Sequence, residues 1–388
     1  MNVRPISTTA PMPTVADLFS GAEAGIDALV APWVGASDQS AMLSRASWAI
    51  RAIVDGHAET SGKAPRLWIP DYFCDSALTF VRETPTPIVL YPVCEDLEPD
   101  WTICERMAVD APPNLFLQVH YFGWPRDLSR ARAFCNRHGA TLIEDAAHAL
   151  APGPGIGSIG DYTIWSLYKH LPLPDGALLV ARRSALGADA VLHAARRLAA
   201  RGSAWAGLWP LRRLVQRLTP ELALRLRRDA RSFDEDAELA RRGDAAGISS
   251  IARRLAAKYS RRLSEITERR RRNEAAVRTT LEDCGGLVPA FPPPPPGIAP
   301  YRAVFRADST DQARFWYEAF TQFGNAVETW PDLPQEVRKA PDRHRGALAL
   351  RQSCFGLPVH ADHEPQELAA AYGPACAANS ARRARALR

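Results

Sequence analysis

The sequence predicts an α/β fold in which a mainly parallel sheet is covered by helices on both faces, followed by a smaller C-terminal α+β domain. Two observations lead to this class. Short apolar segments alternate with amphipathic helical ones between residues 44 and 181, as they do when helices connect the strands of a parallel sheet. In addition, the length of 388 residues suggests a large and a small lobe.

The composition limits the classes of protein to which the chain can belong. Hydrophobic residues make up 46% and charged residues 23%, which is ordinary for a globular protein with a sizeable core. Forty-eight basic residues against 43 acidic ones give a net charge of only +5, which does not describe a nucleic-acid binder. We therefore expect small-molecule partners and no nucleic acid.

The cysteines and the N-terminus indicate the compartment. The seven cysteines are scattered, odd in number and form no C-x-x-C pair, which favours reduced thiols over a disulfide framework or a metal site. The first residues contain no apolar signal segment, and no stretch approaches a membrane-spanning length. These features predict a cytoplasmic protein without a metal.

The N-terminal part begins with an arm and leads to the first helices. Residues 1–14, rich in Pro and Thr, predict a flexible arm, and residues 15–34 are loosely helical. A clearer helix opens at residues 44–47 and has Trp48, Ile50 and Ile53 on its apolar face.

Strands follow at residues 67–70, 87–93, 114–120 and 141–143, with an amphipathic helix over 127–138. The last of these strands ends in two adjacent carboxylates, Glu144 and Asp145. Ligands of such sheets lie at the carboxyl ends of the strands, which is where Asp145 is expected.

A lysine, Lys169, follows these carboxylates and precedes another apolar strand at 177–181. An α/β enzyme can hold a pyridine cofactor with these two groups. The lysine forms a Schiff base with the cofactor aldehyde, and the acid keeps the ring nitrogen protonated. From spacing alone other interpretations stay open, because a strand-end Asp often caps a helix and a loop lysine is often a solvated charge.

Four sequence motifs add to this pattern. They are VHYFGWPRDL (119–128), IEDAAHA (143–149), GSIGDYTIWS (157–166) and YKHLPLPDGALLV (168–180). Their series resembles the DegT/DnrJ/EryC1/StrS aminotransferases, and the resemblance covers most of the chain. It implies the aspartate aminotransferase-like fold, called fold type I, and pyridoxal 5'-phosphate as the cofactor.

The resemblance also implies roles for individual residues. Lys169 is the Schiff-base lysine and the base that moves a proton, and Asp145 pairs with the pyridinium nitrogen. His148 stands where the family has a Gln near the ring hydroxyl. Ser166 corresponds to a phosphate-binding serine, although the loop from Gly160 to Lys169 is two residues shorter than usual.

Other cofactor contacts are expected earlier in the chain. Ser47, preceded by Ala46 in place of the usual glycine, matches a helix start that holds the phosphate. Phe73 aligns with an aromatic residue that stacks on the pyridine ring, and the alternative is a core phenylalanine. The Asn that usually crosses the dimer interface is not visible, and residues 247–250 stand near its place.

The segment 183–245 is a basic helical insertion rich in Arg, Leu and Trp. We expect it to pack its apolar face within the protein's own oligomer. Two alternatives are binding to an anionic membrane surface and recognition of a diphosphate by the arginines.

The predicted large domain spans 15–250 and the small one 251–374. The small domain begins with a long helix over 249–281, followed by a Pro-rich spacer at 292–296 and a strand over 301–305. Residues 375–388 are expected to be a disordered tail.

The implied function is transfer of an amino group, from glutamate or a similar donor, to a keto sugar nucleotide by a homodimer. Dehydrating relatives carry His at the lysine position, so retention of Lys169 favours amino transfer. The alternatives are a pyridoxal phosphate enzyme of another reaction type, such as a sugar dehydratase or an amino-acid-modifying enzyme, and a non-catalytic binding module.

Overall fold

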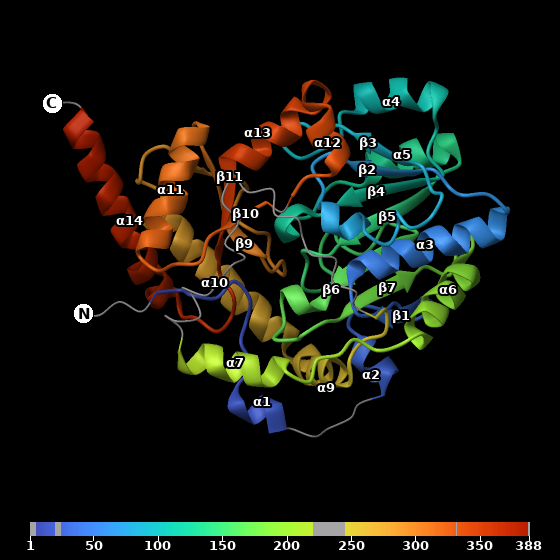
Figure 1. Cartoon of the computed structure of the whole chain (residues 1–388), viewed down its shortest axis with the longest axis horizontal. Helices are drawn as coiled ribbons and strands as arrows, with labels where there is room; N and C mark the ends of the chain where they lie inside the picture. The colour runs from blue at the N-terminus through green and yellow to red at the C-terminus, as the bar shows by residue number, and fades with distance from the viewer. Residues whose placement is uncertain (1–4, 20–24, 220–244, 331, 387–388) are drawn as a thin grey trace.

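The computed structural model describes residues 5–19, 25–219, 245–330 and 332–386. Over these ranges the chain forms two sheets in two lobes, with helices packed around them (Figure 1). The predicted class, a mainly parallel central sheet flanked by helices with a smaller C-terminal α+β part, is confirmed.

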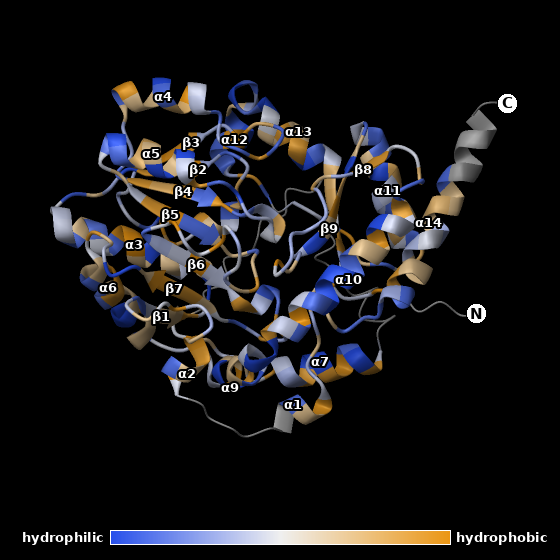
Figure 2. Ribbon diagram, turned by 180° about the vertical axis from the view of Figure 1, so that it is seen from behind, coloured by the Kyte–Doolittle hydropathy of each residue, from blue (hydrophilic) through white to orange (hydrophobic). Residues whose placement is uncertain are grey.

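The larger sheet has, among the described residues, seven strands in the order β1-β7-β6-β5-β4-β2-β3. β7 is antiparallel to both of its neighbours, and the remaining pairs are parallel. The strands are β1 (Gln39–Leu43), β2 (Leu67–Pro70), β3 (Ile88–Tyr91), β4 (Leu115–Val119), β5 (Thr141–Ala146), β6 (Tyr162–Ser166) and β7 (Ala177–Ala181). In Figure 2 β4 and β7 are mostly hydrophobic, as expected of strands covered on both faces.

Alternate residues of β7 face two different cores. Leu179 packs in the core that includes α3 and α6, whereas Leu178 packs in the core that includes α2 and α9. Helix α3 lies so close to α6 that a Cβ on Gly56 would come within 2.4 Å of a backbone atom of Val191. The helices of the large lobe are α1 (Val15–Phe19), α2 (Ile26–Val30), α3 (Ala46–Ser61), α4 (Trp101–Asp110), α5 (Ser129–His138), α6 (Ala188–Ala200), α7 (Trp209–Leu218) and α9 (Ser250–Tyr259).

The smaller sheet is antiparallel, in the order β10-β11-β9-β8. Its strands are β8 (Leu287–Pro289), β9 (Arg302–Ala307), β10 (Glu328–Thr329) and β11 (Cys354–Pro358). The helices of this lobe are α10 (Leu263–Leu281), α11 (Thr310–Gln322), α12 (Gln335–Lys339), α13 (Arg345–Ser353) and α14 (Pro365–Ala386). Short 3-10 helices are η1 (Asp75–Leu78), η2 (Tyr121–Gly123), η3 (Leu167–Lys169), η4 (Ser260–Arg262) and η5 (Pro341–Arg343).

The C-terminal segment differs from the prediction. Residues 375–386 continue α14, so the expected disordered tail is wrong for them. Ala375 is fully buried and Asn379 donates a hydrogen bond to the carbonyl of Cys284 at 2.6 Å. The structure also brings Cys284 and Cys376 together, with a Cα–Cα distance of 5.1 Å.

The predicted long helix over 249–281 is broken into α9 and α10 by η4. Leu255 and Ala256 of α9 pack with the core of the large lobe, whereas Val277 and Leu281 of α10 pack with that of the small lobe. The change from one core to the other therefore occurs along α10, later than the predicted boundary at residue 250.

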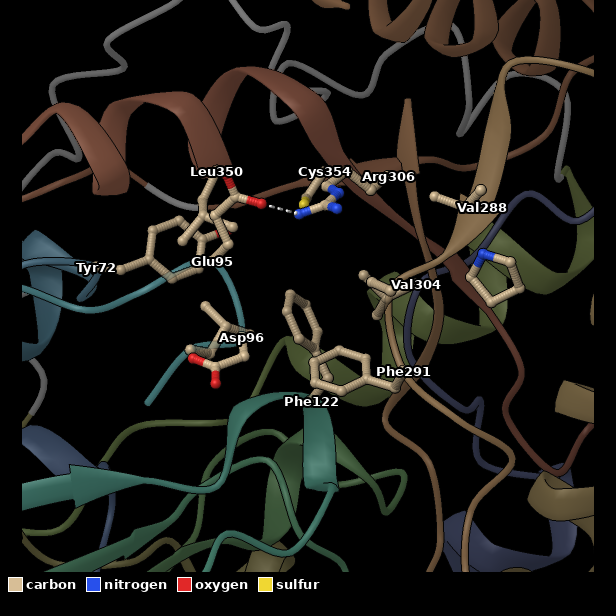
Figure 3. A pocket seen from close by; sticks show the side chains of 13 residues that line it. Tyr72, Glu95, Asp96, Phe122, Val288, Phe291, Val304, Arg306, Leu350 and Cys354 are labelled. Carbon is tan, nitrogen blue, oxygen red and sulfur yellow. Dashed lines mark hydrogen bonds and ion pairs between the residues drawn. The ribbon is translucent and has the colours of Figure 1, made fainter. Parts of the chain in front are cut away.

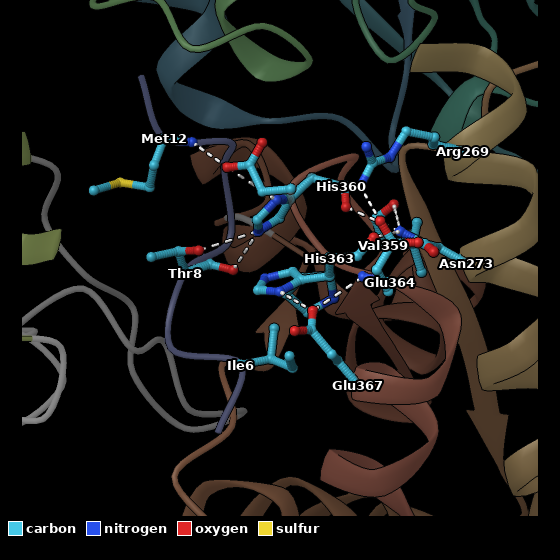
Figure 4. Close-up of polar contacts among 12 residues, drawn as sticks. Ile6, Thr8, Met12, Arg269, Asn273, Val359, His360, His363, Glu364 and Glu367 are labelled. Atoms are coloured by element: carbon cyan, nitrogen blue, oxygen red, sulfur yellow. Dashed lines mark hydrogen bonds and ion pairs between the residues drawn. The ribbon is translucent and has the colours of Figure 1, made fainter. Parts of the chain in front are cut away.

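The N-terminal arm, predicted to be flexible, is docked on the small lobe from residue 6 onward (Figure 4). Ile6 is buried, and its N–H donates to Oδ1 of Asn325 at 2.9 Å. The hydroxyl of Thr8 lies 3.1 Å from Nε2 of His360, and the N–H of Met12 donates to Asp362 at 2.6 Å. Polar groups of the small lobe thus take the place of water as hydrogen-bond partners of the arm.

The basic segment is described up to residue 219, and its remainder, 220–244, lies outside the described residues. α6 packs against α3, whereas α7 and the residue before it expose an apolar row consisting of Leu208, Leu211, Val215 and Leu218. None of the helices in the described ranges has the length and apolarity needed to cross a bilayer.

Candidate active site

The predicted site residues gather at the carboxyl edge of the large sheet. Asp145 is near the end of β5, and Ser166 ends β6, which runs parallel to β5. Ser166 is opposite Ala177 of β7, which is opposite Leu43 at the end of β1. Since neighbouring strands lie about 4.8 Å apart, Leu43 is roughly 10 Å from Ser166. The start of α3, shortly after β1, therefore faces the same edge.

The first of the two adjacent carboxylates, Glu144, is fully buried and organises a loop. Its Oε1 lies 2.8 Å from Nε2 of His120 and accepts a hydrogen bond from the N–H of Gly157. Its Oε2 accepts from the N–H groups of Ile159 at 3.3 Å and Gly160 at 3.0 Å. Burial raises the pKa of Glu144, but His120 and these amides outweigh burial and lower the pKa overall. Glu144 therefore has a structural task.

The second carboxylate, Asp145, has fewer partners. It is 7% exposed, and its Oδ1 accepts a hydrogen bond from the N–H of Ala147 at 2.9 Å. Burial raises its pKa, and the Ala147 hydrogen bond and the nearby charge of Lys169 offset this only in part. A carboxylate in this environment favours a cationic ligand, because opposite charge stabilises its ionised form.

Lys169 is the last residue of η3 and is half-buried. Its Nζ lies 6.0 Å from the centre of the ring of Tyr301, which directly precedes β9 of the small lobe. The next residue, His170, is buried and lies 5.2 Å from the same ring. The lysine therefore faces the junction of the two lobes.

His148 lies among aromatic rings at this junction. Its ring is nearly parallel to that of Tyr301, at 4.8 Å and 9°. Phe122 lies 5.7 Å away at 27°, and Trp330 lies 5.6 Å away at 82°. Burial, followed by the positive charges of its neighbours, holds the pKa of His148 well below its usual value. The imidazole is therefore neutral at neutral pH.

Two features at the same edge suit a phosphate group. The hydroxyl of Ser166 is buried and has no hydrogen-bond partner among the described residues. Ala46 and Ser47 form the start of the 16-residue helix α3, and the preceding Arg45 contributes no side-chain cap. Free amides at a helix start and a buried hydroxyl are donors of the kind that hold a phosphate dianion.

The segment at residues 245–249 covers the start of α3 within the same chain. Ser44 donates from its N–H to the carbonyl of Ala246 at 2.8 Å and from its hydroxyl to that of Ala245 at 2.7 Å. Asp175 accepts a hydrogen bond from the N–H of Ser249 at 2.9 Å. The acidic residue of the predicted Asp-Gly pair thus fixes the entry into α9.

Phe73 is separate from this aromatic group. It is 4% exposed in the core of the large lobe, and it is not among the rings that contact His148 in the described part of the chain. Sequence reasoning missed Phe122, Tyr301 and Trp330. Phe122 lies inside a recognised motif, whereas Tyr301 and Trp330 come from distant segments whose proximity no local pattern indicates.

A cavity of about 330 Å³ lies between the lobes behind Phe122 (Figure 3). Phe122 and Phe291 lie at the bottom in Figure 3, with Glu95 and its ion-pair partner Arg306 above them. Among the described residues, neither Lys169 nor Asp145 lines it. It is therefore distinct from the edge that carries the lysine.

Comparison with known proteins identifies the central segment. Residues 92–204 match the sequence model of the DegT/DnrJ/EryC1/StrS aminotransferase family. The matched segment contains Asp145, His148, Ser166 and Lys169, so the resemblance and the predicted enzyme class, a pyridoxal phosphate-dependent aminotransferase, are confirmed.

Solved structures of aminotransferases share the fold over nearly the whole chain. The aminotransferase TlmJ from Streptoalloteichus hindustanus is 20% identical, with 92% of this chain and 89% of that chain covered and a TM-score of 0.66. The putative sugar aminotransferase Spr1654 from Streptococcus pneumoniae, in its apo-form, is 13% identical, with 98% and 99% covered and a TM-score of 0.71. DesI, solved in the presence of its TDP-sugar product, is 18% identical, with 92% and 84% covered and a TM-score of 0.66.

The side chains at the carboxyl edge fit pyridoxal phosphate. The buried Ser166 hydroxyl lacks a partner in the described part of the chain and can donate to a phosphate. Asp145 is buried, burial raises its pKa, and a protonated ring nitrogen beside it would stabilise its ionised form. Lys169, whose charge acts on Asp145, has a primary amine of the kind that forms a Schiff base with the aldehyde of pyridoxal phosphate.

Proposed function

We propose that Lys169 binds pyridoxal phosphate covalently and that the enzyme transfers an amino group between a donor and a keto sugar. The observation that carries this proposal is the meeting of a lysine, a buried carboxylate and a buried unpartnered hydroxyl at one sheet edge. When bound, the cofactor supplies a pyridinium ring that withdraws electrons from the substrate carbon.

Lys169 and Asp145 are the catalytic residues in this proposal. Nζ of Lys169 takes the proton from the substrate carbon that bears nitrogen and returns it to the cofactor carbon. The carboxylate of Asp145 keeps a proton on the ring nitrogen, because the pair of opposite charges is stable in a buried site. Retention of a lysine at position 169 favours this reaction over dehydration.

The remaining proposed residues hold the cofactor in place. Ser166 and the amides of Ala46 and Ser47 bind the phosphate, which fits their position at the sheet edge. His148 donates a hydrogen bond to the ring oxygen. Phe73 stays a proposed stacking residue, supported by its alignment and not by a ring contact.

For the substrates, we propose glutamate or a similar amino donor and a nucleoside-diphosphate keto sugar. The names of DesI, solved with a TDP-sugar product, and of the putative sugar aminotransferase Spr1654 support a sugar acceptor. Arg196 on α6, Arg201 just beyond it and Arg212 on α7 are exposed, and guanidinium groups of this kind bind phosphate oxygens. Binding energy from the diphosphate would position the keto carbon.

We also propose a homodimer that works in the cytoplasm. The apolar row exposed on α7 supports an assembly of copies, and the sequence composition supports the compartment. Neither a membrane surface nor nucleic acid is among the proposed partners.

Borohydride reduction tests the covalent site. After incubation with pyridoxal phosphate and reduction, mass spectrometry of the peptides is expected to find the cofactor on Lys169. Lys63 and Lys258 serve as internal controls, since neither lies at this edge. An adduct found mainly on another lysine would refute the assignment.

The acceptor is tested separately. The enzyme is loaded with amino groups from glutamate, freed of donor, and offered a panel of keto compounds while its visible spectrum is followed. A nucleoside-diphosphate keto sugar is expected to restore the aldehyde spectrum faster than the free keto sugar. Restoration by keto acids alone would reject the sugar acceptor while leaving the role of Lys169 intact.

A further inference from the structure

The backbone around η2 is shaped to hold the imidazole of His148. The N–H of Phe122 donates to Nδ1 of His148 at 3.2 Å. Phe122 has a φ of 55°, a left-handed conformation that costs a non-glycine residue about 1 kcal/mol or more. Gly123 follows with a φ of 91°, and a Cβ there would lie 2.5 Å from the carbonyl oxygen of His148. Such a strained turn is kept only where its surroundings require it.

The hydrogen bond from Phe122 fixes the tautomer of His148. A neutral imidazole carries one proton, and the nitrogen that accepts a hydrogen bond is the one without it. Because Nδ1 accepts from Phe122, the proton lies on Nε2. Burial and the charges of Lys169, His170 and Arg302 keep the ring neutral by lowering its pKa. Nε2 of His148 is therefore a hydrogen-bond donor.

The plane of this imidazole is set by Tyr301 of the small lobe. The two rings are 4.8 Å apart and only 9° from parallel. The backbone of Tyr301 is also tied to the turn that holds His148, because its N–H donates to the carbonyl of Phe122 at 2.8 Å. The same residue thus contacts both the imidazole and the strained turn.

Two buried arginines in turn fix Tyr301. Arg270 and Arg302 each donate to its carbonyl oxygen at 2.8 Å. The guanidinium of Arg302 lies 3.8 Å from the centre of the tyrosine ring and donates to its hydroxyl at 3.1 Å. Arg302 is itself paired with Glu328. Burying two guanidinium groups costs free energy. Both of these groups contact Tyr301, whose ring lies near Lys169.

We propose that Tyr301 is a positioning residue, which holds His148 so that its Nε2–H points at the ring oxygen of pyridoxal phosphate. This inference rests on the proposed function of Lys169 and extends it to a residue of the small lobe. The placement of the small lobe then affects the electronic state of the cofactor. A Gln at position 148, as in the resembled family, would donate from an amide and would need no stacking partner.

The variants are chosen to separate positioning from simple packing. Tyr301→Phe keeps the aromatic face, whereas Tyr301→Leu keeps apolar volume without it. Each is also made in a His148→Gln background, in which the donor is retained without an imidazole. Tyr317→Ala, a half-buried tyrosine of α11, controls for loss of a tyrosine elsewhere in the lobe. Thermal unfolding without cofactor verifies that each variant folds.

Two quantities are measured: the dissociation constant of pyridoxal phosphate and the pH midpoint of its visible absorbance on the enzyme. A donor to the ring oxygen stabilises the deprotonated, more negative form, so its loss moves the midpoint to higher pH. Tyr301→Leu is expected to raise the midpoint and to weaken cofactor binding about threefold to tenfold, the range of one hydrogen bond. Tyr301→Phe and Tyr317→Ala are expected to stay near wild type.

The variant that combines His148→Gln with Tyr301→Leu tests whether Tyr301 acts through His148. In the His148→Gln background, Tyr301→Leu is expected to change the midpoint much less than it does in the wild type. An equal change in both backgrounds, or none in the wild type, would overturn the positioning role and leave Lys169 as the covalent site. Failure of the wild type to take up cofactor at all would instead reject the proposed function.

Discussion

Replacing Glu144 by Gln is expected to destabilise the folded protein strongly. Each carboxylate oxygen of Glu144 has two contacts among the described residues, one oxygen with His120 and Gly157 and the other with Ile159 and Gly160. The amide of Gln retains one accepting oxygen, so two of these four contacts are lost and their donors face an N–H₂ group. At about 1.5–3 kcal/mol per hydrogen bond to a charged group, the loss of two is about 3–6 kcal/mol.

The neighbouring Asp145→Asn is the matched control, because its effect has the opposite sign. The pKa of Glu144 is lowered on folding, so its contribution is present above the unfolded value of about 4.3 and is lost as the pH falls through the folded value. The pKa of Asp145 is raised, so its ionised form destabilises the folded protein above an unfolded value of about 3.9. Without cofactor, Asp145→Asn is therefore expected to be more stable than wild type at pH 7.

The assay is urea denaturation of the cofactor-free protein at pH 7 and at stepwise lower pH. Glu144→Gln is expected to unfold at a lower urea concentration at pH 7, and the difference from wild type should shrink as the pH falls below about 4. Equal midpoints for Glu144→Gln and wild type at pH 7 would refute the structural role of Glu144. A destabilised Asp145→Asn would refute the view that burial dominates at that carboxylate.

Three other expectations concern the site and the arm. Asp145→Asn should retain cofactor but lose turnover by orders of magnitude, measured as the glutamate half-reaction, and unchanged turnover would reduce Asp145 to a structural acid. Ser166→Ala should weaken cofactor binding about tenfold in equilibrium dialysis, since it removes a buried donor, and an unchanged constant would place the phosphate elsewhere. Deleting residues 1–13 should lower the unfolding temperature of the small lobe by exposing the surface around Asn325, and an unchanged temperature would mean that the arm does not stabilise this lobe.

Site residues that lie close together in the sequence could be predicted, whereas those from distant segments could not. Asp145, His148, Ser166 and Lys169 fall within 25 residues, and two adjacent strands bring them to one edge. Local pattern and family motifs therefore placed them correctly relative to the sheet. Tyr301 contacts His148 only because the small lobe packs against the large lobe at this edge. The periodicity of the sequence does not indicate how the two lobes pack.

The errors at the two termini share a cause. The arm and the tail are poor in aromatic residues and rich in Pro, Thr, Ala or Arg, a composition typical of disorder. Both are ordered by a few specific contacts, such as Ile6 with Asn325 and Asn379 with Cys284. Single anchoring side chains contribute little to composition, which is why the sequence pattern missed them.

The docking of the arm imposes an order on biosynthesis. The segment around Ile6 is synthesised before its partner Asn325, which lies 319 residues later. His360 and Asp362, which receive Thr8 and Met12, are made later still. During translation Ile6 therefore lacks its small-lobe partner while the residues of the large lobe are synthesised and can fold. A chain that ends before residue 325 therefore lacks the hydrogen-bond partner of Ile6.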